Sequence, residues 1–155
     1  MKNFKKIFLS LLIIGLIFCV PKTNAYAKTY KANKVTAQQI VKEFQKKCPV
    51  KKVFAHKKSD MIEEDRPNRY KTKYGFYDKK YKKVYCTVEV FEDVYDAVSR
   101  KAYIDMLQET YSIFGFDESI PLQAHRYKNV ILRTSQKMPL KYYLKYYNVL
   151  KKIVK

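Results

Sequence analysis

The stretch KVYCTVEVF, residues Lys83–Phe91, indicates the fold class because it alternates two kinds of side chain. Small apolar residues take every second position and share one side of an extended chain: Val84, Cys86, Val88 and Val90. A period of two with β-branched and aromatic residues predicts a strand. The preceding stretch Arg69–Tyr77 alternates in the same way, and Asp78–Lys82 links the two. We therefore expect an antiparallel hairpin here.

Helices are predicted before and after this hairpin in the sequence. In the first helix, Thr36 can cap the N-terminus, and Gln39, three residues later, completes a capping box. Pro49 ends this helix. A second is predicted over residues 92–111, where acidic residues suit the positive helix N-terminus. Pro139 opens the last, which runs to the end of the chain.

Three shorter strands complete the pattern, at Val50–His56, His125–Tyr127 and Val130–Thr134, the last two joined by a turn at Lys128-Asn129. The order is then α-β-β-β-α-β-β-α. Successive hairpins give antiparallel pairs, so the pattern predicts an α+β two-layer sandwich, with the helices packed on one face of a single sheet.

The first 27 residues read as a secretory signal peptide. Lysines precede an uncharged run of 14 residues, Ile7–Val20, and a small-x-small site follows at Ala25–Ala27. The run is shorter than the roughly 20 residues of a spanning helix. We expect cleavage between Ala27 and Lys28, with cleavage after Ala25, a retained anchor or lipidation at Cys19 as alternatives. Residues 28–34 would form a flexible basic start, and residues 35–155 a single α+β domain without a transmembrane helix.

The charge of the chain favours anionic partners. The full sequence carries a net charge of +19, and removal of the four lysines of the leader lowers it to +15. Outside a cell, such a charge is attracted to envelope polymers, lipid headgroups or an acidic protein, while nucleic acid is a less favoured partner. The alternative is generic solubility in a lysine-rich protein.

The last helix shows where such a partner would bind. Four lysines recur at helical spacing and no acid lies between Leu140 and Lys155. They are Lys141, Lys145, Lys152 and Lys155. A second apolar stripe, which starts at Tyr142 and Tyr146, indicates a helix wedged between neighbours or one that offers this stripe to a partner.

A second candidate lies just before the first long strand. Arg66, Asn68, Arg69 and Tyr70 form an arginine-rich segment that could hold an anion bidentately. The alternative is a turn tied down by its own arginine side chains.

The remaining chemistry-bearing residues indicate no enzyme. Cys48 and Cys86 can form one disulfide or stay as two buried thiols. Neither has a nucleophile signature around it, and His56 and His125 are not spaced as zinc ligands. The sequence predicts no catalytic residue, metal or cofactor.

Three segments resemble small exported lipoprotein-type domains of Gram-positive bacteria. They are the Arg-Pro-x-x-Tyr-x-Thr-Lys segment at Arg66–Lys73, Val88–Phe91 and Asn129–Arg133. The resemblance implies an outward-facing α+β domain and, because the function of that family is unassigned, supplies no catalytic residue. The chain differs in its high positive charge and in the large Phe18 before Cys19.

Taken together, these features predict a secreted or surface-associated, non-enzymatic basic protein that binds an anionic partner. An inhibitor or immunity-type protein that masks another protein is the alternative. A wall-active hydrolase is a third reading, disfavoured by the lack of a catalytic constellation.

Overall fold

The computed structural model describes residues 32–56, 70–114, 123–134 and 137–155; within the second range, the side chains of Tyr111, Ile113 and Phe114 are not described. The signal-peptide prediction and the flexible-start prediction, apart from residues 32–34, therefore lie outside the described residues. Among those that are described, no helix is both long and apolar enough to cross a membrane.

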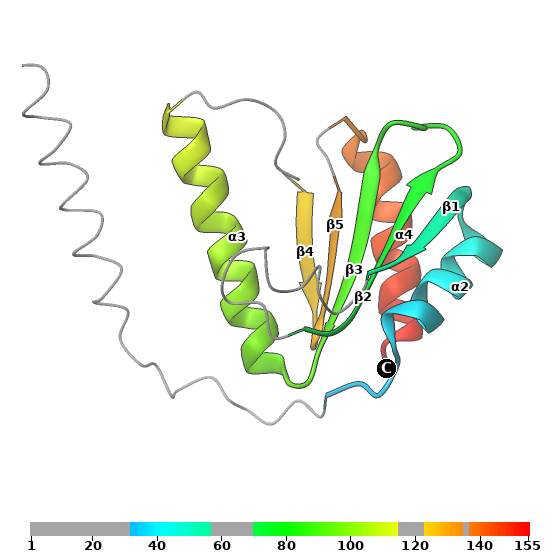
Figure 1. The fold of residues 1–155 in the computed structure, drawn as a ribbon, viewed down its shortest axis with the longest axis horizontal. Helices are drawn as coiled ribbons and strands as arrows, with labels where there is room; N and C mark the ends of the chain where they lie inside the picture. Colours follow the sequence, from blue (N-terminus) through cyan, green and yellow to red (C-terminus); the bar gives the residue numbers. More distant parts are fainter. Residues whose placement is uncertain (1–31, 57–69, 115–122, 135–136) are drawn as a thin grey trace, which may run out of the picture.

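A five-stranded antiparallel sheet in the order β1-β2-β3-β5-β4 forms the centre of the structure (Figure 1). The strands are β1 (Val50–Ala55), β2 (Tyr70–Asp78), β3 (Tyr85–Phe91), β4 (Gln123–Tyr127) and β5 (Val130–Thr134). The helices are α2 (Ala37–Lys47), α3 (Val94–Phe114) and α4 (Leu140–Ile153). The α+β class, the antiparallel sheet and the predicted element order are confirmed.

Helix positions follow from local signals in the sequence. Thr36 and Gln39 form the expected capping box at the start of α2. Asp93 accepts a hydrogen bond from the backbone N–H of Asp96 at 2.8 Å and so caps α3. The tight β4–β5 turn requires a left-handed residue, and Lys128 takes a φ of 51° there.

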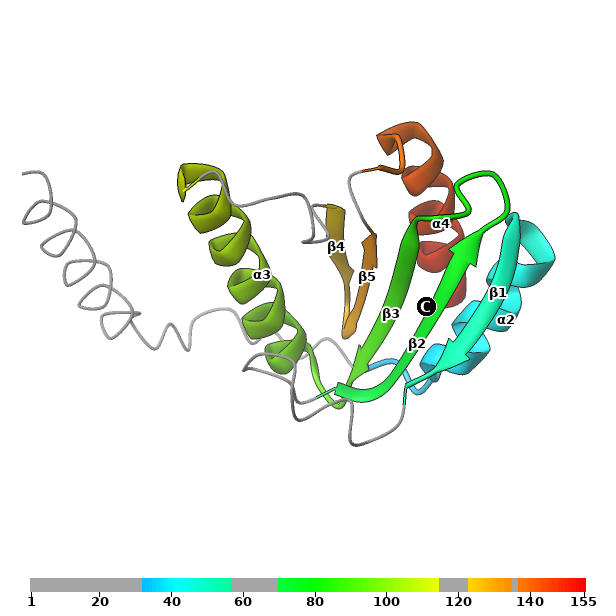
Figure 2. The same cartoon turned by 45° about the horizontal axis from the view of Figure 1, so that its top comes forward.

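One part of the prediction is wrong: the helices do not all pack on one face. Helices α2 and α4 cover one face, whereas α3 lies against the other (Figures 1 and 2). The sheet is thus the middle of three layers. The physical reason lies in β3, because both of its sides are buried: Val88 and Val90 join the core with α2 and α4, and Glu89 faces α3.

Glu89 holds the α3 layer to the sheet. Its side chain is fully buried, at 0% exposure, and one oxygen accepts from Nε of Arg100 on α3 at 3.4 Å. The other oxygen lies 3.4 Å from Nε of Arg133 on β5. Arg100, which is only 2% exposed, thus has the buried partner that a guanidinium on an apolar helix face requires.

We expect Glu89→Gln to lower the free energy of unfolding by about 3 kcal/mol, because it removes one charge from a buried ionic cluster. Urea denaturation measures this change. Glu92→Gln is the matched control, since Glu92 forms an exposed ion pair with Lys71, and its effect should stay below about 1 kcal/mol. Equal losses in the two variants would show that the buried cluster does not hold the α3 layer.

Candidate anion-binding surface

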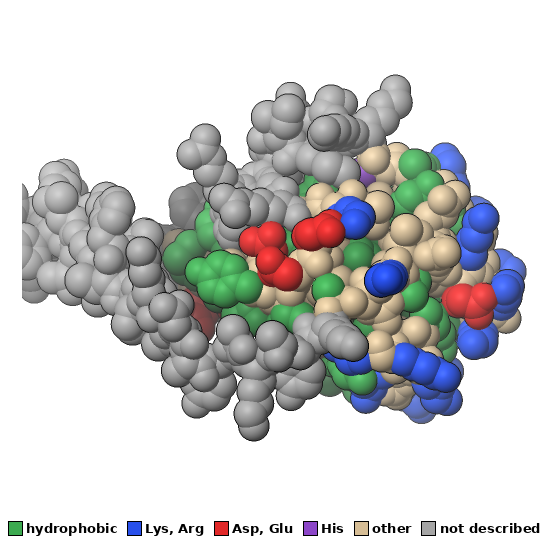
Figure 3. Space-filling view, turned by 90° about the horizontal axis from the view of Figure 1, so that it is seen from below, with side chains coloured by type: hydrophobic (Ala, Val, Ile, Leu, Met, Phe, Trp, Pro, Cys, Tyr) green, Lys and Arg blue, Asp and Glu red, His purple; other side chains and the backbone are tan. Residues whose placement is uncertain are grey.

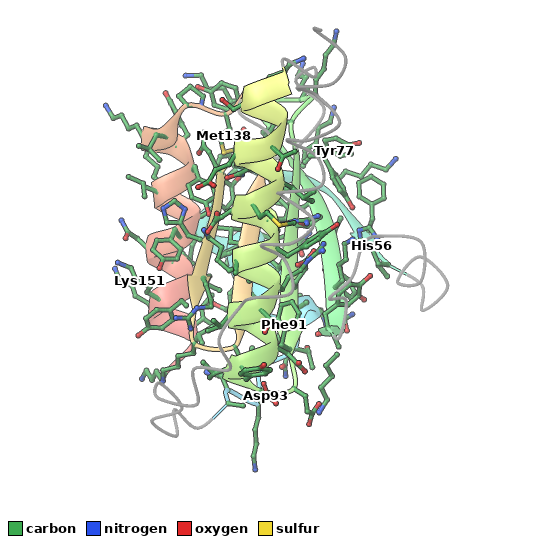
Figure 4. All side chains as sticks on the ribbon, turned by 90° about the vertical axis from the view of Figure 1, so that its left-hand side faces the viewer. His56, Tyr77, Phe91, Asp93, Met138 and Lys151 are labelled. Carbon is green, nitrogen blue, oxygen red and sulfur yellow. The ribbon has the colours of Figure 1, made fainter. Side chains whose placement is uncertain are left out.

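The lysines of α4 lie where the sequence predicts them. Lys141, Lys145, Lys152 and Lys155 are all exposed. The opposite side of the helix is packed into the core, with Tyr143, Tyr146, Leu150 and Val154 fully or nearly fully buried. Lys151 also lies on the outer side of α4 (Figure 4).

The second apolar stripe of α4 belongs to the fold. Tyr146 is buried, and Tyr142, Val149 and Ile153 are partly buried against the same core. The helix is wedged between the sheet and α2, with which it is in contact. Of the two sequence interpretations, the structure supports the wedged helix.

Helix α2 extends the positive surface beside α4. We call the exposed lysines of both helices, together with Lys155 just after α4, the lysine face: Lys42, Lys46, Lys47, Lys141, Lys145, Lys151, Lys152 and Lys155. One acid lies among them within the two helices, Glu43, which pairs with Lys46 and Lys47. No acid lies within α4. Like charges at i, i+4 on a helix repel by a few tenths of a kcal/mol each, so an anion bound here relieves that repulsion.

A cluster of two tyrosines and two lysines borders the lysine face where the β2–β3 connection meets α4. We call it the aromatic corner: Lys80, Tyr81, Tyr142 and Lys145. Nζ of Lys80 donates to the hydroxyl of Tyr142 at 2.7 Å and lies 4.6 Å from the centre of its ring. Nζ of Lys145 lies 5.1 Å from the same ring, and the Tyr81 ring packs edge-on against it. Two ammonium groups therefore lie within cation–π distance of one tyrosine ring.

Asp78 positions this corner. Its Oδ1 accepts from the backbone N–H groups of Lys80 and Tyr81, at 2.7 and 2.9 Å, which shapes the start of the connection. Its Oδ2 accepts from the hydroxyl of Tyr146 at 2.6 Å, which ties the connection to α4. Sequence reasoning missed Lys80 as a site residue, because its approach to Tyr142 depends on contacts between elements far apart in the chain.

The two lysines change the acidity of Tyr142. The hydrogen bond from Lys80, and then the charge of Lys80, lower the pKa of this phenol below its ordinary value of 10.0. Burial acts in the opposite direction on Tyr143 and Tyr146 and raises their pKa values. Tyr142 is thus a surface phenol that favours its anionic form more than its buried neighbours do.

Tyr142 should ionise at lower pH than an ordinary tyrosine, and Lys80→Gln should raise its pKa back toward 10. Carbon-13 NMR of the tyrosine Cζ nuclei during a pH titration measures both values, with Tyr142→Phe to assign the signal. Lys82→Gln, which changes another exposed lysine of the same connection, should leave the titration unchanged. An unaltered Tyr142 pKa in Lys80→Gln would contradict the hydrogen bond.

Cys48 and Cys86, the cysteines among the described residues, are two free, buried thiols rather than a disulfide. Both belong to the core between the sheet, α2 and α4, and Sγ of Cys86 lies 3.2 Å from Oγ1 of Thr134. Burial raises the pKa of Cys48 to about 11 and that of Cys86 to about 12. Thiols with such values are poor nucleophiles at neutral pH, because the thiolate is the reactive form.

Both thiols should react slowly with an aromatic disulfide reagent at pH 8 in the folded protein, since Cys48 would be about one-thousandth ionised. In urea, two thiols per chain should react at the ordinary rate when the protein is prepared without residues 1–27, which contain Cys19. The assay is the absorbance of the released thiolate. Fast modification of folded protein, or fewer than two thiols after unfolding, would contradict the buried, unpaired state.

The histidines contact tyrosines. Nδ1 of His125 lies 3.1 Å from the hydroxyl of Tyr143, which itself donates to the carbonyl of Leu132 at 2.9 Å. Since that hydroxyl proton is used, Nδ1 is the donor to Tyr143. Burial lowers the pKa of His125, which favours the neutral ring. The described residues contain no group of three or more His, Cys, Asp or Glu side chains that could hold a metal.

The arginine-rich candidate is only partly visible. Arg66, Asn68 and Arg69 lie outside the described residues. Tyr70 is buried in the core beneath α3, where its ring packs edge-on against Phe91 with centroids 6.4 Å apart. Tyr70 therefore belongs to the core and not to the lysine face.

A second aromatic group lies on the α3 side of β1, β2 and β3. Phe54, Tyr77 and Tyr85 pack ring against ring at 5.4 to 6.4 Å, and Tyr85 is hydrogen-bonded to His56. Figure 4 shows His56 and Tyr77 on the same side of α3. A Cβ at Gly75 would clash with the Tyr85 hydroxyl, so the glycine is what lets this ring lie across β2. The group has a structural explanation in the packing of the sheet.

No family model, no curated protein and no solved structure matches this chain. The resemblance to exported lipoprotein-type domains therefore stays a prediction.

Proposed function

We propose that this protein is exported and acts, without catalysing a reaction, by binding an anionic polymer of the cell envelope through the lysine face. The observation that carries the proposal is the set of exposed α4 lysines with no acid in the same helix. The adjoining α2 adds three more exposed lysines and one acid. Such a surface attracts polyanions over distances of about a Debye length.

The aromatic corner supports a polymer that carries phosphate. Nζ of Lys80 and Nζ of Lys145 both lie within about 5 Å of the centre of the Tyr142 ring, so an anionic group that reaches the ring meets two ammonium donors. Ammonium groups bind phosphate as point charges without requiring one bidentate geometry. This arrangement suits a flexible chain with repeated charges better than one small ligand of fixed shape.

The thiols also favour a binding role over a hydrolytic one. The raised pKa values of Cys48 and Cys86 keep both residues in the thiol form at neutral pH. A wall-active cysteine hydrolase would need a thiolate. Secretion and envelope location come from the predicted signal peptide and are part of the proposal.

The test is binding to poly(glycerol phosphate), measured as isotherms at several salt concentrations. Changing Lys141, Lys145, Lys152 and Lys155 to Gln should weaken binding at low salt. It should also reduce the slope of log K against log salt by about three, at roughly 0.7 per phosphate contact with a flexible chain. The loss arises because the variant releases fewer counterions.

The control changes four exposed lysines outside α2 and α4 to Gln: Lys51, Lys82, Lys83 and Lys137. It has the same net charge as the α4 variant, so a difference between them reports position and not total charge. Equal affinities and equal slopes for the two variants would contradict the proposal. Tight binding that depends little on salt would instead favour a protein partner with an apolar contact.

A further inference from the structure

The outer side of α3 carries an exposed apolar stripe. Tyr95, Val98 and Met106 are 71%, 44% and 38% exposed, and the exposed Ala102 lies between the last two. Spacings of three, four and four residues place all four on one side of the helix. The inner side is apolar too, because Ala97 and Ile104 are buried beneath it. Helix α3 is therefore apolar on two opposite sides.

Acidic residues border this stripe, and two of them pair with nearby lysines: Glu92 with Lys71, and Asp105 with Lys101. We define the α3 outer face as the four stripe residues together with Glu92, Asp93, Asp105 and Glu109. Among described acids outside the core, only Glu43 lies away from α3 and its start. On the face that Figure 3 shows, most acidic side chains lie toward the α3 side, and most lysines and arginines lie toward the other.

The lysine face has the complementary character. It is positively charged, and Leu140 at its start is 54% exposed. The two faces lie on opposite sides of the sheet, since α3 covers one sheet face and α4 the other. One molecule therefore cannot bring its own two faces together, but two molecules can.

From this complementarity we propose that the α3 outer face binds the lysine face of a second copy of the chain. The apolar stripe would pack near Leu140, while Glu92 and Glu109 would approach lysines of α4. The contact joins two different surfaces, so a pair of copies keeps one free α3 outer face and one free lysine face. Repetition of such a contact gives chains of molecules rather than closed dimers.

Size and charge make this a weak contact. The α4 helix of 14 residues is about 21 Å long. One helix packed across it buries less than a standard protein interface does. The excess positive charge of each copy opposes association at low salt, but a Debye length of about 8 Å at 0.15 M salt leaves the local contacts dominant.

The experiment is sedimentation velocity at about 0.15 M salt on the protein in its processed form, as defined by mass spectrometry. The average sedimentation coefficient of the wild type should rise with concentration up to about 1 mM, as expected for a small interface. Glu92→Lys/Glu109→Lys reverses the two charges of the α3 outer face that would contact α4, and Lys145→Glu/Lys152→Glu reverses two contacting charges of the lysine face. Each variant alone should stay monomeric, because the reversed residues then approach residues of the same sign on the second copy.

A mixture of the two variants should associate again. The substituted residues of each variant then approach residues of opposite charge on the other variant. All four positions lie at the surface, so circular dichroism should show the wild-type fold. A monomeric wild type at every concentration, or association of either variant alone, would overturn the proposal.

A further variant separates this inference from the proposed function. Val98→Gln/Met106→Gln removes two exposed apolar side chains without a change in charge. It should abolish association while the isotherm on poly(glycerol phosphate) stays that of the wild type. Association that persists in this variant would overturn the role of the stripe, whatever the polymer measurement shows.

Discussion

The carboxylate of Glu89, buried in the middle of the sheet, is the constraint on which the arrangement of layers depends. A charged group with no exposure is tolerated only with charged partners in place. Two guanidinium groups supply them, from Arg100 on α3 and Arg133 on β5. Strand β3, the neighbouring strand β5 and helix α3 are thus linked at one point. An apolar residue at position 89 would have no charge to pair with Arg100, so this link between the sheet and one turn of α3 would be lost.

The ionic contact beneath α3 also explains why the two sides of the molecule differ in chemistry. The face under α2 and α4 is an apolar core in which Phe44, Phe76 and Tyr146 pack ring against ring. The face under α3 mixes apolar residues with buried charges. With α3 on its own side, the acids of this helix lie far from the lysines of α2 and α4. The separation of charge on the surface follows from the separation of the helices.

Much of the fold could be predicted from local patterns. The alternation in Lys83–Phe91, the capping box at Thr36 and the proline before Leu140 each act within a few residues, so the elements and their order were predicted correctly. The side of the sheet taken by α3 was predicted wrongly. Glu89 and Arg100 are 11 residues apart, and their pairing is not a local signal. The exposed lysines of α4 were predictable for the same reason as the helix itself, whereas the contact between Lys80 and Tyr142 spans 62 residues.

The sequence by itself determined the composition of each surface: which helix carries lysines, which carries acids, and which strands alternate. These properties depend on the spacing of residues along one element, and hydrogen bonding within that element sets the spacing. Only the tertiary structure decided how those surfaces are combined. It buried Cys48 and Cys86 as separate thiols, placed Tyr142 close to two lysines, and set the acidic and basic helices on opposite faces of the sheet. The physical reason is that these outcomes depend on packing and on buried charges that pair across the chain, and such pairs form only when distant segments meet.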